Sequence, residues 1–122
     1  MHDCDIERTL ERYGLRKTKD RHAILHLFSS SRTWSAAQLH RRLTTMDLST
    51  IYRNILTLVE RGILRETHVH GAETHYELSG LAHHDHLVCD RCDITECVPC
   101  PVRRLPMPHF LELRGRCSAC MK

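Results

Sequence analysis

The sequence lacks a long apolar segment, a strong net charge and more than a few aromatic residues. No apolar run approaches the roughly 18 residues that a membrane-spanning helix needs, and the formal net charge is only +3. The first ten residues are acidic and polar, unlike the basic and then apolar layout of a secretion signal. These absences disfavour a membrane protein and a secreted precursor, so we expect a cytoplasmic protein with reduced cysteines.

Proline is absent from residues 1–77, because all four prolines lie between residues 99 and 108. In this proline-free stretch, apolar residues recur with helical periodicity between short turn signals. Thr18 is placed to cap one helix, and Ser35 with Gln38 forms a capping-box pattern before another. The predicted elements are helices over residues 3–13, after Thr18, after Ser35 and from Leu48 to Gly62, and strands over Ile63–Val69 and Thr74–Leu78.

Helices followed by a two-stranded hairpin are typical of a winged helix-turn-helix, with a generic helical domain plus hairpin as the alternative. Ile51, Ile55 and Leu58 form the inward stripe of the last predicted helix, which leaves its polar residues outside. The start of such a recognition helix meets base edges in the major groove. The predicted DNA contacts on this helix are Ser49, Thr50, Tyr52 and Arg53.

Positive charge gathers near the second predicted helix although the whole chain carries little net charge. Residues 8–21 hold six basic and two acidic side chains, a local balance of +4. Such basic groups neutralise DNA phosphates and supply most of the non-specific affinity of DNA-binding proteins. A solvated charged face gives the same pattern, so this charge indicates DNA binding only in combination with the recognition helix.

Cysteine and histidine are abundant, with seven and eleven residues. Six cysteines fall in the last 34 residues, where Cys89-x2-Cys92 and Cys117-x2-Cys120 are separated by 24 residues. Two such pairs complete a tetrahedral four-thiolate zinc shell with no open position, which is typical of a structural site. The segment after a predicted hinge at residues 79–82 is too small to fold by apolar burial alone, so we expect zinc to stabilise it.

Other uses of these cysteines stay open at this point. Cys92-x4-Cys97-x2-Cys100 has the spacing of a plant-type iron–sulfur run, with Cys117 or Cys120 as the fourth ligand. A redox pair or a second zinc position at Cys97 and Cys100 is a further alternative. The simplest alternative treats the cysteines as small core residues.

Four potential metal ligands, His83, His84, Asp85 and His86, stand shortly before Cys89. In an extended strand, His84 and His86 share one face, and His83 and Asp85 share the other. Imidazole with carboxylate suits Fe(II), Zn(II) or Mn(II), and geometry decides among these metals. The alternation therefore predicts two ligand pairs that point toward two different places.

Taken together, these motifs resemble the ferric uptake regulator family, whose members are dimeric, metal-responsive repressors with an N-terminal winged helix and a C-terminal dimerisation domain. The resemblance covers nearly the whole chain in the family's order. It implies an α+β fold with a winged helix-turn-helix at residues 1–78 and a small zinc-stapled α/β dimerisation domain at residues 79–122. The matching stretches are Gly14-Leu-Arg-Lys-Thr18 with Arg21, Ser35-Ala36 with Leu39, Leu48-Ser-Thr-Ile-Tyr-Arg53, Tyr76-Glu77-Leu78, His83-His-Asp-His-Leu-Val-Cys89-x2-Cys92 and His109-Phe-Leu-Glu-Leu-Arg-Gly-Arg-Cys117-x2-Cys120.

The resemblance also implies roles for individual residues. Arg16 is the basic residue that reaches the minor groove, and Tyr52 and Arg53 contact the major groove. The implied metal ligands are Cys89, Cys92, Cys117 and Cys120 at the structural zinc, Glu77, His84 and His86 at a hinge sensing site, and His83, Asp85 and His109 at a second site in the dimerisation domain.

Three departures from the family pattern affect these sites. Thr33 stands where the sensing site usually takes a histidine, which also weakens a peroxide-sensing role. Val98–Pro108 is short and proline-rich where the family has a helix with an acidic ligand, so the second site lacks that ligand. Cys97 replaces an acid, which favours a softer metal such as zinc. Candidate replacements for the missing histidine are His68, His70, His75 and Cys97.

We therefore expect a cytoplasmic homodimer that represses metal-homeostasis genes by binding a palindromic DNA operator. Its expected cofactors are a structural Zn²⁺ and an exchangeable Zn²⁺ or Fe²⁺, with Mn²⁺ as a further option; no membrane and no small-molecule substrate are expected. No nucleophile–base pair is evident, so we do not expect an enzyme. The alternatives are a thiol switch that acts through Cys97 and Cys100, and a chain that dimerises only on DNA.

Overall fold

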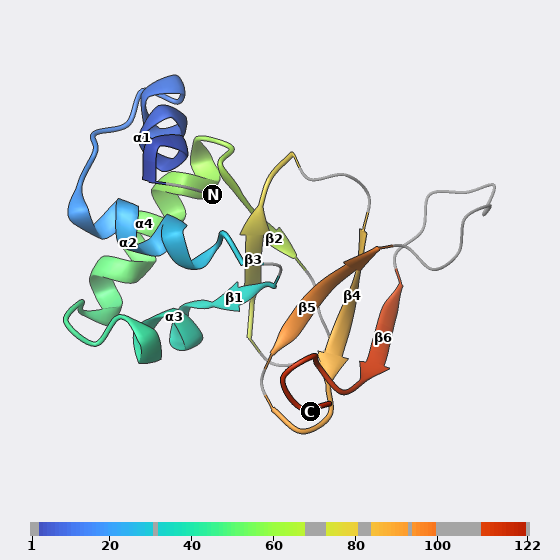
Figure 1. Cartoon of the computed structure of the whole chain (residues 1–122). Coiled ribbons are helices and arrows are strands. Elements are labelled where there is room, and N and C mark those ends of the chain that lie inside the picture. Colours follow the sequence, from blue (N-terminus) through green and yellow to red (C-terminus); the bar gives the residue numbers. More distant parts are fainter. Residues whose placement is uncertain are drawn as a thin grey trace.

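The computed structural model describes residues 3–30, 32–67, 73–80, 84–92, 94–99 and 111–121. In these ranges the chain forms four helices and six strands, with the helices beside two small sheets (Figure 1). None of the helices in the described part is long and apolar enough to cross a membrane. The elements are α1 (Asp3–Arg12), α2 (Lys19–Leu27), β1 (Trp34–Ser35), α3 (Ala36–Arg42), α4 (Leu48–Glu60), β2 (Leu64–Thr67), β3 (His75–Leu78), β4 (His84–Cys89), β5 (Thr95–Pro99) and β6 (Glu112–Gly115).

Local capping interactions set the bounds of three helices. Thr18 Oγ1 accepts a hydrogen bond from Arg21 N at the start of α2. At the start of α3, Ser35 and Gln38 exchange the two hydrogen bonds of a capping box, at 2.9 and 3.1 Å. Gly62 follows α4 with a φ of 84°, a left-handed conformation that glycine adopts at little cost. These boundaries confirm the predicted helices.

One apolar core joins the helices to the first sheet. Ile51, Ile55 and Leu58 of α4 are fully buried, as their spacing predicts. They belong to one cluster with apolar residues of α1, α2 and α3 and with Leu64 and Tyr76 of the sheet. The sheet has the order β1-β3-β2, and β2 and β3 form the antiparallel wing. This arrangement confirms the winged helix-turn-helix.

The C-terminal sheet has the order β5-β4-β6, with β4 antiparallel to β5 and parallel to β6. After residue 82, the only strand-like runs in the sequence are His86–Val88 and Phe110–Leu113, so the sequence does not predict β5. Residues 95–99 show no apolar alternation that would reveal a strand. Thr95 is buried, Glu96 accepts a hydrogen bond from Ser118, and Cys97 contacts Glu77. Residues 100–110 lie outside the described ranges. They include most of Val98–Pro108, the short segment that stands where the family has a helix.

The two sheets meet through the segment that precedes β1. Arg32 forms an isolated antiparallel bridge with Glu96, and Thr33 N donates a hydrogen bond to Thr95 O at 2.9 Å. The first sheet therefore lies between the helices and the C-terminal sheet, as Figure 1 shows. These contacts bring β3, one strand of the wing, close to β4 and β5.

Candidate metal centres

Four cysteine sulfurs gather where β4 ends and the chain turns after β6. Cys89 is the last residue of β4, Cys92 lies in the following turn, and Cys117 and Cys120 lie in the C-terminal turn. The four sulfurs lie within 4.8 Å of one another, and those of Cys92 and Cys117 are 3.7 Å apart. The two CxxC pairs thus come together as their spacing predicts, and their donor set suits a tetrahedral zinc ion.

The thiols of this group differ in their readiness to ionise. The backbone N–H groups of Cys117 and Arg91 lower the pKa of Cys89 to about 6. Hydrogen bonding with the sulfurs of Cys117 and Cys89 raises the pKa of Cys120 to about 12. Metal binding deprotonates such thiols, because only the thiolate is a good ligand. The group is therefore ready to form a thiolate shell around a thiophilic cation.

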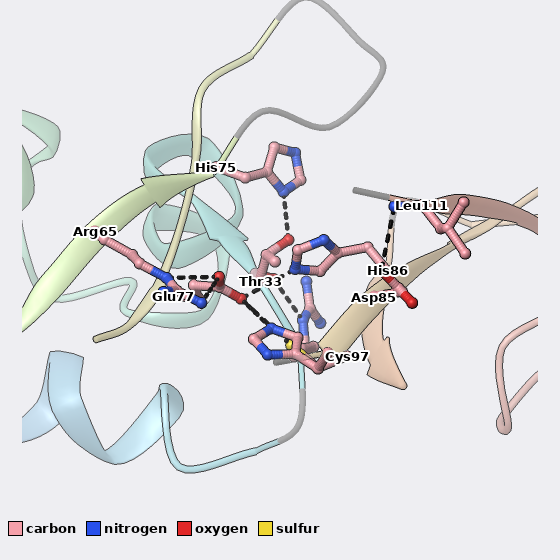
Figure 2. Close-up of polar contacts among 10 residues, drawn as sticks. Thr33, Arg65, His75, Glu77, Asp85, His86, Cys97 and Leu111 are labelled. Atoms are coloured by element: carbon pink, nitrogen blue, oxygen red, sulfur yellow. Dashed lines mark hydrogen bonds and ion pairs between the residues drawn. The ribbon is translucent and has the colours of Figure 1, made fainter. Parts of the chain in front are cut away.

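A second group joins the wing to the C-terminal sheet (Figure 2). Glu77 comes from β3, His84 and His86 from β4, and Cys97 from β5, with donor atoms within 4.8 Å of one another. Glu77 Oε2 lies 2.8 Å from Nε2 of His84, 3.0 Å from Nε2 of His86 and 3.6 Å from the sulfur of Cys97. The period of two along β4 puts both histidines on one face, as predicted. One oxygen, two nitrogens and one sulfur make a four-donor set.

The carboxylate of Glu77 is buried, with 3% of the residue exposed, and neighbouring donors stabilise its charge. Burial by itself raises the pKa of Glu77, but hydrogen bonds with His86, His84 and Arg65 outweigh burial and lower the pKa to about 2. Arg65 lies opposite Glu77 in the β2–β3 pair; its Nε donates a hydrogen bond to Oε1 at 2.9 Å, and its Nη2 forms an ion pair with the same oxygen at 2.8 Å. The two carboxylate oxygens therefore face different partners.

Cys97 is one of the candidates for the missing ligand of the sensing site, and its sulfur lies in this group. Its thiol is partly buried, and burial together with the charge of Glu77 raises the pKa of Cys97 to about 12. Thr33 is fully buried and places Oγ1 2.7 Å from Nδ1 of His75, beside the four-donor group but not part of it (Figure 2). Among the described candidates, Cys97 and not His75 completes the set. His68 and His70 lie outside the described residues.

Asp85 lies on the other face of β4 from the two histidines. It is fully buried, and its Oδ1 accepts a hydrogen bond from Leu111 N at 3.1 Å (Figure 2). His83 and His109, its predicted partners at the second site, lie outside the described residues, and so does Cys100. The second site therefore stays a prediction.

The predicted DNA contacts lie on accessible surface of α4 and of the loop before α2. Tyr52 is 48% exposed, Ser49 and Arg53 are exposed, and Thr50 is half-buried. Arg53 Nη2 lies 3.5 Å from Thr50 Oγ1, and Arg16 is exposed in the loop. These positions leave the side chains accessible to a DNA groove, and the contacts themselves stay predictions.

Sequence reasoning missed two residues that support the centres. Arg65 contacts Glu77, and a basic residue opposite an acidic one across the predicted hairpin is the signal that could have found it. Glu96 accepts hydrogen bonds from Ser118 N and Oγ at 2.8 and 3.0 Å, which connects β5 to the turn of the second cysteine pair. No sequence pattern points to this second contact, because it depends on the undetected strand.

Comparisons with known proteins identify relatives of this chain. A family model described as the ferric uptake regulator family matches residues 12–104. The chain is 35% identical to a ferric uptake regulation protein of Brucella suis over 98 residues, covering 75% of this chain and 70% of that protein. It is 31% identical to one of Neisseria meningitidis over 125 residues, covering 88% and 87%.

Solved structures give the same result for the fold. The ferric uptake regulator of Vibrio cholerae superposes with a TM-score of 0.69 at 29% identity, covering 90% of this chain and 98% of that one. A zinc-bound manganese uptake regulator superposes with a TM-score of 0.77 at 24% identity, covering 91% and 97%, and thus shares the fold.

Proposed function

This chain belongs to the ferric uptake regulator family, and on that premise we propose that it is a metal-dependent, DNA-binding transcriptional repressor rather than an enzyme. The observation that carries the proposal is the convergence of Glu77 from the wing with His84, His86 and Cys97 from the C-terminal sheet. A cation bound by these donors connects the DNA-binding part to the rest of the chain. Metal supply is thereby converted into DNA affinity.

In this proposal, Cys89, Cys92, Cys117 and Cys120 hold a structural zinc ion. The four sulfurs lie within 4.8 Å of one another, and the sheet that they close is too small to be stabilised by its apolar residues. Zinc supplies a cross-link there whose apparent binding free energy, about 10–16 kcal/mol in small zinc domains, is coupled to folding. Residues 79–122 form the dimerisation domain, and residues 1–78 bind DNA.

Regulation arises at the four residues of the hinge group, Glu77, His84, His86 and Cys97. Glu77 lies on β3, which packs on the same core as α4, so its position is linked to that of the recognition helix. Fixing Glu77 against β4 and β5 restricts the angle between the wing and the C-terminal sheet. The metal-bound arrangement then shifts the population toward dimers whose two recognition helices match a palindromic operator.

Zinc is the metal that this donor set suits best. Cys97 supplies a soft sulfur ligand, and two imidazoles with one carboxylate oxygen complete four donors. Iron is the second candidate for the regulatory ion, and manganese the third. A repressor of zinc-homeostasis genes is therefore the finer form of the proposal.

The competing function, a thiol switch through Cys97 and Cys100, has less support. A redox-active cysteine needs a thiolate near neutral pH, whereas the pKa of Cys97 is raised to about 12. Its sulfur points toward Glu77 and the histidines of the hinge group. Cys97 is therefore better placed as a metal ligand than as a nucleophile.

The test measures zinc-dependent binding to a duplex DNA site selected from a random library in the presence of zinc. In fluorescence anisotropy, wild type binds this DNA as free zinc rises, and His84→Ala loses the response while keeping one zinc per chain. His26→Ala is the matched control, because His26 is exposed on α2 and far from the group in sequence. A zinc response that survives in His84→Ala contradicts the proposed hinge site.

The DNA contacts need a separate test with the same duplex. Arg53→Ala removes an exposed cation near the start of α4 and is expected to weaken binding by about 1–3 kcal/mol if the guanidinium reads a base. Arg114→Ala removes an exposed arginine from β6 and serves as the control for charge. Zinc content stays the same in both variants. Unchanged DNA affinity in Arg53→Ala would exclude this residue from the interface.

A further inference from the structure

Arg65 places two of its three guanidinium nitrogens on a single oxygen of the hinge carboxylate. Its Nε and Nη2 lie 2.9 and 2.8 Å from Oε1 of Glu77. Arginine frequently pairs with a carboxylate through one donor on each oxygen, which is not the geometry found here. The other oxygen, Oε2, faces His84, His86 and Cys97. Figure 2 shows this carboxylate between the arginine and the remaining donors.

We propose that Arg65 is a positioning residue that makes Glu77 a one-oxygen ligand and thereby selects the metal at the hinge. This inference rests on the proposed function, because it requires a cation at the four-donor group. Because Arg65 holds Oε1 toward the wing, Oε2 is the oxygen that faces the other donors, and the donor count is four. Zinc favours four ligands of this mixed kind.

Denticity matters because a carboxylate can bind a metal through one oxygen or through both. If Oε1 were free, Glu77 could offer two oxygens and the group would supply five donors. A larger, more oxygen-rich shell suits harder cations such as Mn²⁺, whereas sulfur and imidazole in a tetrahedral set suit zinc. A hydrogen-bonding partner behind a metal ligand fixes the orientation of that ligand and tunes the metal. Arg65 therefore acts on selectivity through Glu77.

The fold gives Arg65 this role without making it part of the core. Arg65 and Glu77 are directly opposed in the antiparallel β2–β3 pair, so the arginine approaches the carboxylate from the wing. The side chain of Arg65 is 45% exposed, while that of Glu77 is 4% exposed. Arg65 lies outside the apolar core cluster. Its replacement therefore changes the carboxylate's partner and leaves the packing in place.

The experiment uses the full chain with zinc retained at the four cysteines and Co²⁺ added to the hinge group. The visible absorption of Co²⁺ is strong in four-coordinate sites, weaker in five-coordinate sites and weakest in six-coordinate sites. We expect a strong spectrum for wild type and a weak one for Arg65→Met. Arg65→Met is also expected to lower the ratio of zinc affinity to manganese affinity by about tenfold or more, which competition titrations measure.

Two further variants separate positioning from general effects of charge. Arg65→Lys keeps a charged donor toward Oε1 and is expected to restore most of the strong spectrum. Arg114→Met removes an exposed arginine from β6 and is expected to behave as wild type. Circular dichroism checks folding, and Arg65→Leu, with the same expected loss, replaces Arg65→Met if that variant does not fold.

Two failures are distinguishable. A strong Co²⁺ spectrum and an unchanged zinc-to-manganese ratio in the variant without Arg65 would overturn the role of this arginine and leave the hinge site intact. A wild-type chain that shows no Co²⁺ absorption beyond that of the four-cysteine centre would instead overturn the proposed function on which the inference rests.

Discussion

The two candidate metal centres of this chain differ in where their donors come from. The four-cysteine group takes all its ligands from residues 89–120, from the end of β4 and the turns after β4 and β6 at one end of a small sheet. The hinge group takes Glu77 from the wing and its other three donors from that sheet. Metal at the first group therefore closes a local unit, whereas metal at the second connects two units that could otherwise move apart.

The chemistry of the donors follows the same division. Four thiolates with no open position give tight binding that is coupled to folding. The hinge group mixes carboxylate, imidazole and thiol, and its carboxylate already has partners without metal in His84, His86 and Arg65. Because the buried carboxylate of Glu77 is hydrogen-bonded without metal, we expect the occupancy of the hinge group to change without unfolding the protein. This contrast is what a structural site and a sensing site require.

The largest expected effect comes from breaking the first group. Cys117→Ser removes a buried ligand, and we expect loss of the structural zinc and of order in the C-terminal sheet, with a cost on the order of 10 kcal/mol. Hydrogen exchange should then show fast exchange in β4 and β6 and retained protection in α4. A C-terminal sheet that stays protected without zinc would show that the two groups do not differ in this way.

The next largest effect concerns the pH dependence of the hinge group. Since the pKa of Cys97 is raised to about 12, its thiol is protonated at neutral pH and must release its proton when metal binds. The apparent zinc affinity should therefore rise with pH, by about tenfold per unit between about pH 7 and 9. Calorimetry in buffers of different ionisation enthalpy measures the proton released.

Cys97→Asp sharpens this test, because a carboxylate is already ionised in that range. We expect the variant to lose most of the pH dependence and to bind manganese better relative to zinc. The four-cysteine zinc should be unaffected. A steep pH dependence that persists in Cys97→Asp would show that the released proton comes from another group.

A smaller effect is expected at the contact beside the hinge. Thr33→Val keeps the shape of the buried side chain and removes its hydrogen bond with His75, so the free energy of unfolding should fall by about 1–3 kcal/mol. Because neither residue belongs to the four donors, zinc affinity should stay the same. Urea unfolding and zinc competition measure the two quantities. A large loss of zinc affinity would place His75 among the ligands.

The smallest effect is expected at the connection between the two centres along β5. Ser118→Ala removes the hydroxyl donor to Glu96 and keeps the backbone donor. The contact is exposed, so stability should fall by no more than about 1 kcal/mol. Neither zinc occupancy nor metal-dependent DNA binding should change. A marked shift in hinge affinity would reveal that the two centres act as one coupled unit.

The sequence predicted those features of the structure that are set by residues close together in the chain. The caps at Thr18 and Ser35, the buried stripe of α4 and the pairing of the CxxC motifs all follow from short-range patterns. The alternation along β4 likewise placed His84 and His86 on one face. These features need no knowledge of the rest of the chain.

Long-range placement could not be predicted in the same way. Strand β5 has no apolar alternation, so its position beside Thr33 and its delivery of Cys97 to the hinge depend on tertiary contacts. The choice between Cys97 and His75 also required the register of two separate sheets. Arg65 was missed because hairpin register is set by exact strand ends, which sequence patterns locate only within a few residues.

Counting metal ions while DNA binding is measured tests the central claim most directly. Native mass spectrometry of the chain, before and after a mild chelator, is compared with its affinity for the selected DNA at each stage. The account predicts two ions per chain before treatment and one after it, with DNA affinity lost together with the second ion and regained on adding zinc. Undiminished DNA affinity in the one-ion protein, or the absence of any ion that the chelator removes, would contradict it.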